Sequence, residues 1–200
     1  RKPRAPMRLF LALEIDDVLR RRAESARRAM QERHGPVAAR GLRWVRTDQL
    51  HLTLRFLGEV PGALAAQVVA ACAAGVGVSP FTIACGAPAW LPHAGSPRVL
   101  TLPVASGLEQ ARRLKVEVEA LLPVGVPPDD ARPFTPHLTL ARVRDDARRE
   151  VRAIARDVEA EGGPSVALVI DHVVLFRSEL SPQGPAYHEL ARLAFTGCVR

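Results

Sequence analysis

The sequence predicts an α+β fold of two pseudo-symmetric lobes, each an antiparallel sheet with helices packed outside. Strand-like and helix-like stretches mix along the chain through many hairpin-length links, which favours antiparallel sheets. A four-residue word, His-Leu-Thr-Leu, occurs at residues 51–54 and again at 137–140, once in each half of the 200 residues. The elements follow in much the same order around both copies, so we expect two related lobes.

Strands are predicted where a short apolar stretch is rich in β-branched or alternating residues. Each His-Leu-Thr-Leu word belongs to one of them. The predicted strands lie at residues 7–15, 42–46, 50–57, 80–87 and 98–104, at the second word, and at 165–180 and 186–195.

Four helices are predicted between these strands, at about 17–33, 61–74, 106–122 and 145–160. Asp16 suits the start of the first helix, where a carboxylate accepts hydrogen bonds from free backbone N–H groups. Ser106 precedes a Glu by three residues, which is the spacing of a capping box. The Pro-rich stretches 87–98 and 122–136 are predicted loops.

The charge of the chain is unbalanced toward arginine. There are 28 Lys and Arg against 21 Asp and Glu, a formal net charge of +7, and only two of the 28 are lysines. The planar guanidinium of arginine suits phosphate because it donates two parallel hydrogen bonds. Many of these arginines are expected on solvated helix faces, but the excess favours an anionic partner such as nucleic acid.

The three cysteines form neither a C-x-x-C pair nor a disulfide framework. No secretory signal is visible, and no apolar segment approaches the length of a membrane span. We therefore expect a cytoplasmic protein that does not enter a membrane. Residues 1–6 are predicted to form a basic tail, and residues 7–200 a single two-lobed domain.

The repeated word predicts a chemical site. Side chains alternate across a strand, so His51, Thr53 and Arg55 are expected on one face, and His137 and Thr139 on the equivalent face of the second strand. If the strands lie side by side, two imidazoles and two hydroxyls converge. One imidazole can then accept a proton and the other donate one near neutral pH, which suits phosphodiester chemistry. Neither word carries further metal ligands at a suitable spacing, so no metal or other cofactor is expected.

The sequence resembles the RNA 2′,3′-cyclic phosphodiesterases of the 2H phosphoesterase superfamily, also called 2′-5′ RNA ligases. Paired H-x-T-x words define that superfamily, and the stretches MRLFLALEI, RWVRTDQLHLTLRFLGEV, RPFTPHLTLARV and LFRSELSPQGPAYHEL look like the same branch. The resemblance covers most of the chain from Met7 to about Phe195. It implies that the two motifs face each other across a central cleft between the lobes.

The resemblance also implies roles for individual residues. His51 would be the general acid that protonates the departing 3′ oxygen, and His137 the general base that activates water. Thr53 and Thr139 would hold the phosphate. Arg142 matches a family arginine expected to contact phosphate, although strict alternation puts it on the face opposite Thr139, so a bulge or strand end must turn it inward.

Three further residues are candidate substrate contacts. Arg55 has the parity of the motif face, with a solvent-facing or structural role as the alternative. Phe134 and Trp44 could stack on a base, or pack in the core.

The function predicted in this way is metal-independent hydrolysis of RNA 2′,3′-cyclic phosphate ends to 2′-phosphates, with 2′-5′ ligation as the reverse reaction. Two alternatives remain open. The substrate could be a small cyclic nucleotide phosphate, or the protein could bind RNA ends without turning them over. The expected partner is RNA with 2′,3′-cyclic phosphate or 2′-5′ linked ends, and the expected state is a monomer.

Overall fold

The computed structural model describes residues 5–129, 133–160, 162–182 and 184–197. Most of the predicted basic tail therefore lies outside the described residues.

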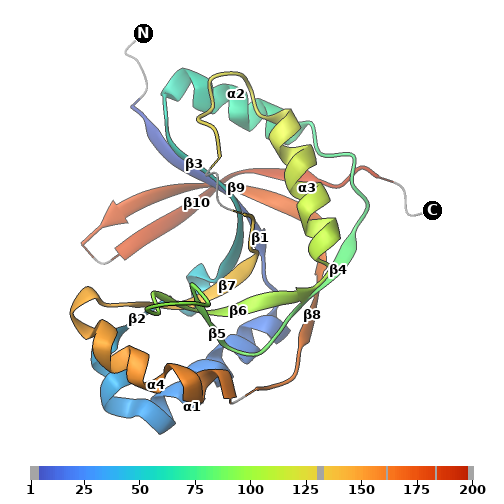
Figure 1. The fold of residues 1–200 in the computed structure, drawn as a ribbon. Coiled ribbons are helices and arrows are strands. Elements are labelled where there is room, and N and C mark those ends of the chain that lie inside the picture. The colour runs from blue at the N-terminus through green and yellow to red at the C-terminus, as the bar shows by residue number, and fades with distance from the viewer. Residues whose placement is uncertain (1–4, 130–132, 161, 183, 198–200) are drawn as a thin grey trace.

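The fold is α+β, and the pairings between its named strands are antiparallel (Figure 1). The strands are β1 (Met7–Glu14), β2 (Leu42–Trp44), β3 (His51–Val60), β4 (Phe81–Cys85), β5 (Ala89–Leu91), β6 (Val99–Ser106), β7 (His137–Val143), β8 (Val166–Ile170), β9 (His172–Ser181) and β10 (Gly184–Ala194). The helices are α1 (Asp17–Gly41), α2 (Gly62–Ala73), α3 (Leu108–Leu121) and α4 (Arg148–Ala160), with short 3-10 turns at Thr47–Gln49 and Asp145–Ala147.

The ten strands form one continuous sheet, and its main path divides into two groups of four strands. Its order is β10-β9-β1-β3-β7-β6-β4-β8, with β2 beside β7 and β5 beside β6. The predicted lobes correspond to β10-β9-β1-β3 and β7-β6-β4-β8, and each lobe takes strands from both halves of the chain. The lobes join where Leu52 of β3 pairs with Leu138 of β7. The two motif strands are therefore the innermost strands of the sheet.

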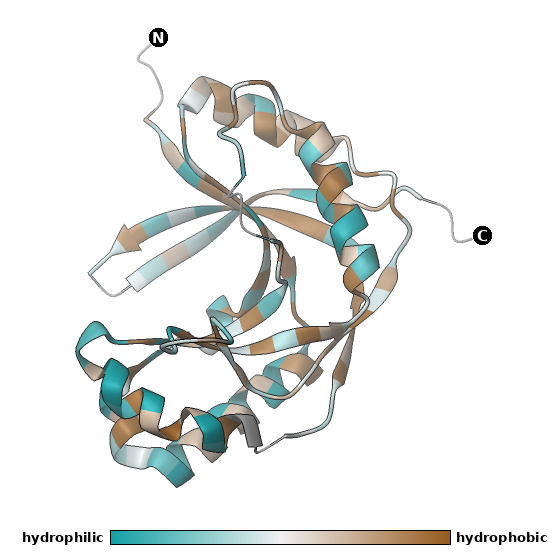
Figure 2. Ribbon diagram, in the orientation of Figure 1, coloured by the Kyte–Doolittle hydropathy of each residue, from teal (hydrophilic) through white to brown (hydrophobic). Residues whose placement is uncertain are grey.

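The helices lie outside the sheet. Helices α1 and α4 pack against each other under the lobe that contains β7, α2 packs on β10 of the other lobe, and α3 runs from beside α2 to β4 (Figure 1). Figure 2 shows that α1 and α4 carry many hydrophilic residues, whereas α2 is mostly hydrophobic. The core lies between these helices and the sheet, and buried residues of all four helices belong to it.

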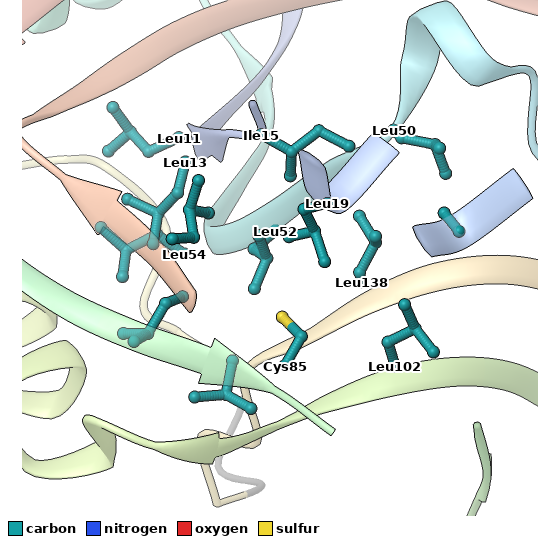
Figure 3. Close-up of a cluster of buried hydrophobic side chains, with 14 of the residues drawn as sticks. Leu11, Leu13, Ile15, Leu19, Leu50, Leu52, Leu54, Cys85, Leu102 and Leu138 are labelled. Carbon is teal, nitrogen blue, oxygen red and sulfur yellow. The ribbon is translucent and has the colours of Figure 1, made fainter. Parts of the chain in front are cut away.

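The leucines of both motifs lie in the core, as the alternation predicts. Leu52, Leu54, Leu138 and Leu140 are each no more than 3% exposed. They pack with leucines of β1, α1 and β6 and with the buried thiol of Cys85 (Figure 3). Because one face of each motif strand is held in this way, its His/Thr face must point away from the core.

Several local predictions are confirmed and others need correction. Asp16 caps α1, since its Oδ1 accepts from the N–H of Leu19 at 2.8 Å. The helix extends past residue 33 to Gly41, because a kink at His34 (φ −124°, ψ 32°) lets Pro36 begin a new helical turn. Ser106 is not a cap: it ends β6, and Gly107 (φ 77°) precedes the first turn of α3.

Two strand predictions also change. The predicted loop 87–98 contains β5, whose Trp90 is buried and donates from Nε1 to the Ala155 carbonyl at 3.2 Å. The single predicted strand at 165–180 is two strands that separate at Asp171. Strand β8 pairs with β4 in one lobe, and β9 pairs with β1 in the other.

Candidate active site

The two His-Leu-Thr-Leu words meet at the junction of the lobes. Leu52 and Leu138, the first leucine of each word, are direct antiparallel partners. Extending that register by one residue in each direction sets His51 opposite Thr139 and Thr53 opposite His137. The two words are thus related by a local twofold axis, and the expected convergence of two imidazoles and two hydroxyls occurs.

Both imidazoles are oriented by the same backbone contact. His51 Nδ1 lies 2.7 Å from the Gln49 carbonyl oxygen, and His137 Nδ1 lies 2.7 Å from the Thr135 carbonyl oxygen. A carbonyl only accepts, so in each ring Nδ1 carries the proton and donates. Each Nε2 is then an acceptor when the ring is neutral and a donor when it is protonated.

The surroundings disfavour the charged form of both rings. Burial is the main cause that lowers the pKa of His51, and the positive charges of Arg142 and His137 lower it further. Burial also lowers the pKa of His137, again with a contribution from Arg142. The hydrogen bonds to the Gln49 and Thr135 carbonyls act in the opposite direction. The two imidazoles and Arg142 are therefore near enough for their charges to interact.

A bulge in each motif strand decides which residue follows the word on the cleft face. In β7 the register with β6 shifts so that Leu140 has no partner, and Arg142 is returned to the face of Thr139. This is the inward turn that the role implied for Arg142 requires. In β3 the register with β1 shifts at Leu54 in the same way, and it brings Phe56 to the face of Thr53.

A cleft of about 440 Å³ adjoins the motifs. His51 and both motif threonines line it, together with three arginines, Arg8, Arg43 and Arg142, and no Asp or Glu is found among the described residues of its wall. His137 is not part of this wall, but its charge reaches His51. Neither motif threonine hydroxyl has a hydrogen-bond partner within the described part of the chain. The cleft is thus basic, with free hydroxyl donors beside an imidazole.

The family model described as the 2′-5′ RNA ligase superfamily matches residues 15–182. An RNA 2′,3′-cyclic phosphodiesterase of Archaeoglobus fulgidus is 32% identical over 184 residues, which cover 92% of this chain and 98% of that protein. The enzyme of the same name from Thermus thermophilus is 34% identical over 207 residues, covering 96% and 91%.

Solved structures share the fold. The crystal structure of TT0787 from Thermus thermophilus has a TM-score of 0.72 at 30% identity and covers 96% of this chain and 99% of that one. E. coli LigT complexed with 3′-AMP has a TM-score of 0.66 at 25% identity, with the same coverage.

The chain belongs to the 2′-5′ RNA ligase superfamily. The resemblance to 2H phosphoesterases and the α+β fold of two lobes are thereby confirmed. No described helix of this superfamily member is long and apolar enough to cross a membrane.

The three candidate substrate contacts lie away from the cleft wall or are engaged elsewhere. Arg55 is 3% exposed and pairs with Glu119 at 2.8 Å, so its predicted placement on the motif face is wrong, because the bulge at Leu54 turns it into the core. Phe134 packs against the core with the Lys115 ammonium 5.1 Å from its ring centroid, and it does not line the cleft.

Trp44 contributes to the cleft wall, but its ring also packs against α1. The Arg27 guanidinium of that helix lies 5.5 Å from the ring centroid. Alternation along β2 directs Trp44 to the face opposite Arg43. Trp44 thus packs against the core and also lines the cleft, so its contact with a base stays a prediction.

An aromatic wall beside His51 was not predicted. Tyr187 of β10 lies 5.3 Å from the His51 ring centroid at nearly a right angle, and Phe10 of β1 lies 5.0 Å from it. Burial raises the pKa of Tyr187, while the charges of Arg142 and Arg8 lower it. Tyr187 is the chain's only tyrosine, which is the one signal that could have marked it.

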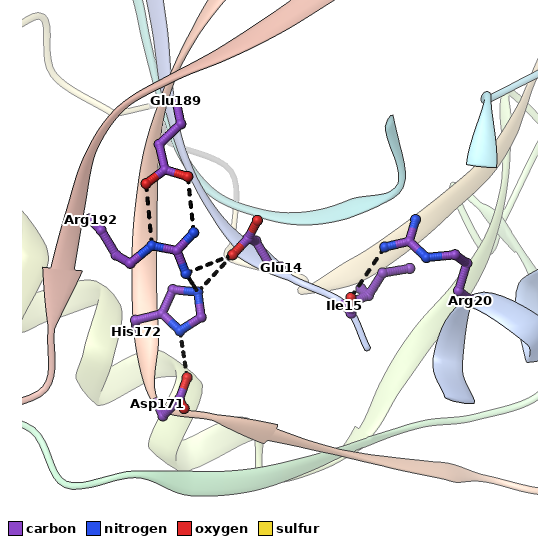
Figure 4. A network of polar contacts seen from close by, with 7 residues as sticks. All are labelled: Glu14, Ile15, Arg20, Asp171, His172, Glu189 and Arg192. Carbon is purple, nitrogen blue, oxygen red and sulfur yellow. Dashed lines mark hydrogen bonds and ion pairs between the residues drawn. The ribbon is translucent and has the colours of Figure 1, made fainter. Parts of the chain in front are cut away.

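A second cleft, of about 400 Å³, also has His51 in its wall and has a different character. It shares Gln49, His51 and Tyr187 with the first cleft, but it is also lined by Glu14, Asp16 and Asp48. Glu14, the cross-strand partner of His51, is held by His172 at 2.8 Å and by Arg192 at 3.0 Å. Arg192 also pairs with Glu189, and Arg20 of α1 donates to the Ile15 carbonyl (Figure 4). Glu14 of this cleft wall is thus ion-paired, in contrast, within the described residues, to the arginines of the first cleft.

Proposed function

We propose that the protein hydrolyses RNA 2′,3′-cyclic phosphate ends to 2′-phosphates, without a metal, through His51 and His137. Curated relatives that align over nearly their whole length carry the name RNA 2′,3′-cyclic phosphodiesterase. The observation that carries the proposal is the shared orientation of the two imidazoles. Both donate from Nδ1 to a backbone carbonyl, which leaves both Nε2 atoms available for proton transfer at one anion.

The reaction needs one proton removed and one proton supplied. A water oxygen attacks phosphorus while His137 Nε2 takes its proton. The bond between phosphorus and the 3′ oxygen breaks, and His51 Nε2 donates its proton to that oxygen. The product keeps the phosphate on the 2′ oxygen. Each positioned proton transfer contributes roughly 10²–10⁴ in rate.

The remaining groups suit the charge that develops on the phosphate. Thr53 and Thr139 have hydroxyls free to donate to the non-bridging oxygens, and Arg142 supplies a positive charge on the same face. The bound anion also favours the protonated form of an imidazole, which offsets the lowered pKa values of the free protein. A 5′-hydroxyl in place of water would give a 2′-5′ linkage by the same proton transfers.

The test is hydrolysis of a 2′,3′-cyclic phosphate by single-histidine variants. His51→Ala and His137→Ala should each lose at least about 10²-fold in kcat, and activity should survive a chelator. His93→Ala is the matched control, because His93 is exposed in a loop away from the cleft. Near-full activity in either motif variant would falsify the two-histidine mechanism.

The same assay separates the alternatives. If the unaltered protein binds RNA ends without turning them over, the result favours a binding module over an enzyme. Turnover of cyclic mononucleotides in preference to RNA ends would favour a small-molecule phosphodiesterase.

A further inference from the structure

We infer that the cleft holds a second phosphate at Arg43, so that its substrate is an RNA chain of at least two nucleotides. The inference rests on the proposed function, because it takes the reacting phosphate to lie between the motifs. The second phosphate is the phosphodiester that precedes the terminal nucleotide.

The placement of Arg43 follows from the pairing of β2 with β7. Arg43 is the direct cross-strand partner of Arg142, so the two side chains leave the sheet on the same face. Directly opposed residues have Cβ atoms about 4.5–5.5 Å apart. Both arginines are exposed, and both line the cleft of about 440 Å³.

This pair of like charges is not balanced by the protein. Like charges directly opposite each other destabilise a sheet. Neither Arg43 nor Arg142 has a hydrogen bond or an ion pair within the described part of the chain. Other exposed arginines do find carboxylates, as Arg46 does with Asp48 and Arg113 with Glu109. A bound polyanion would remove the repulsion, which makes the cost consistent with a binding function.

Arg43 and Arg142 are suited to different phosphates. The bulge in β7 returns Arg142 to the face of Thr139, where it lines the cleft beside the motifs, and its charge lowers the pKa of both motif histidines. Arg43 lies farther along β7, because β2 pairs with residues 141–143 of that strand whereas β3 pairs with it at Leu138, and Arg43 is not among the causes that shift the pKa of either histidine. It is therefore positioned for the neighbouring phosphate, which a guanidinium can bind with two parallel hydrogen bonds.

Arg8 is the other free arginine of the cleft wall, and it is the weaker candidate. It comes from β1, where its cross-strand partners are Glu59 and Ser178. A carboxylate thus faces Arg8 across the strand pair, whereas a second arginine faces Arg43. Arg43 therefore differs from Arg8 in that a like charge, and not a carboxylate, lies opposite it.

The experiment compares two substrates that differ by one phosphodiester. A nucleoside 2′,3′-cyclic phosphate with a free 5′-hydroxyl is measured against a dinucleotide with the same cyclic end. Hydrogen bonds to charged groups contribute enough for a gain of about 10- to 100-fold in kcat/KM for the dinucleotide. Arg43→Gln should reduce the ratio of the two kcat/KM values to near one. The slope of log affinity against log salt concentration for the dinucleotide should also become shallower by about one unit, which corresponds to one lost phosphate contact.

Arg40→Gln is the matched control, because Arg40 is an exposed arginine three residues earlier that does not line the cleft. It should keep the ratio of the unaltered protein. The inference is overturned if the unaltered protein turns over both substrates equally, or if Arg43→Gln leaves the ratio unchanged.

Calorimetric binding of a dinucleotide and a mononucleoside, each ending in a 2′-phosphate, separates this inference from the proposed function. Tighter, Arg43-dependent binding of the dinucleotide by a protein that hydrolyses neither cyclic substrate would support the subsite and reject the hydrolysis. Hydrolysis of both cyclic substrates with equal binding of both products would reject the subsite alone.

Discussion

Strands β3 and β7 carry the same four residues and then differ: Arg55 and Phe56 follow the first word, and Ala141 and Arg142 follow the second. A bulge at the second leucine of each word sends the next residue into the core and the one after it to the cleft. Phe56 and Arg142 thus occupy equivalent positions. The repeated word determines the geometry, and the residues after it determine which strand presents a positive charge.

The surroundings of the two histidines differ as well. His51 packs against the rings of Phe10 and Tyr187. His137 has no aromatic contact within the described part of the chain. Nearly symmetric imidazoles therefore lie in different environments, and such a difference is what allows one to act as acid and the other as base.

The largest expected effect comes from changing the equivalent positions after the bulges. Arg142→Gln should lower kcat/KM for a 2′,3′-cyclic phosphate by about 10²–10³, the usual loss for a missing donor to a developing oxyanion. Phe56→Leu should change it only a few-fold, because it removes no charge. Equal losses in the two variants would show that shape at this position, and not the charge of Arg142, matters.

The residues directly after the bulged leucines predict a difference in stability. Arg55 is buried and pairs with Glu119, whereas its equivalent Ala141 needs no partner. Arg55→Ala should lower the free energy of unfolding by about 3 kcal/mol. This is the lower end for a broken buried pair, because Glu119 is partly exposed and regains water. Urea denaturation measures the change.

Arg46→Ala is the control for this variant, since the Arg46–Asp48 pair is exposed and should contribute nothing measurable. If Arg55→Ala leaves the free energy of unfolding unchanged but weakens substrate binding, Arg55 contacts substrate in the cleft after all.

The comparison of β3 and β7 also shows what the sequence could predict. The two words, their leucine faces and the convergence of the four polar side chains follow from alternation and repetition alone. The inward turn of Arg142 was recognised as necessary but not located. A bulge arises from how a strand pairs with its neighbour, so the residues around Leu54 give no local signal of it. Strict alternation therefore predicts the wrong face for Arg55.

Other parts of the site depend on topology. Arg43, Tyr187 and Phe10 reach the cleft from three strands that are distant in sequence. Tyr187 belongs to a strand whose own residues suggest no chemistry. Only the sheet order, with β9 and β10 returning beside β1, brings it to His51.

The smallest expected effect concerns protonation of the two motif histidines. The pKa values of His51 and His137 are both lowered by burial and by Arg142, so both should titrate below the ordinary value of about 6.5. The unfolded chain then takes up these protons first, and stability should fall as the pH drops below that value. The optimum of kcat/KM should lie on the acid side of about pH 6.5. The kcat optimum should lie at higher pH, because the bound anion favours imidazolium.

The NMR titration of the two imidazoles measures these pKa values without turnover. In Arg142→Gln both should move up toward the ordinary histidine value, since a nearby positive charge has been removed. A shift of only one imidazole would mean that Arg142 serves one motif alone. The symmetry of the two words would then extend to the backbone but not to the electrostatics of the reaction.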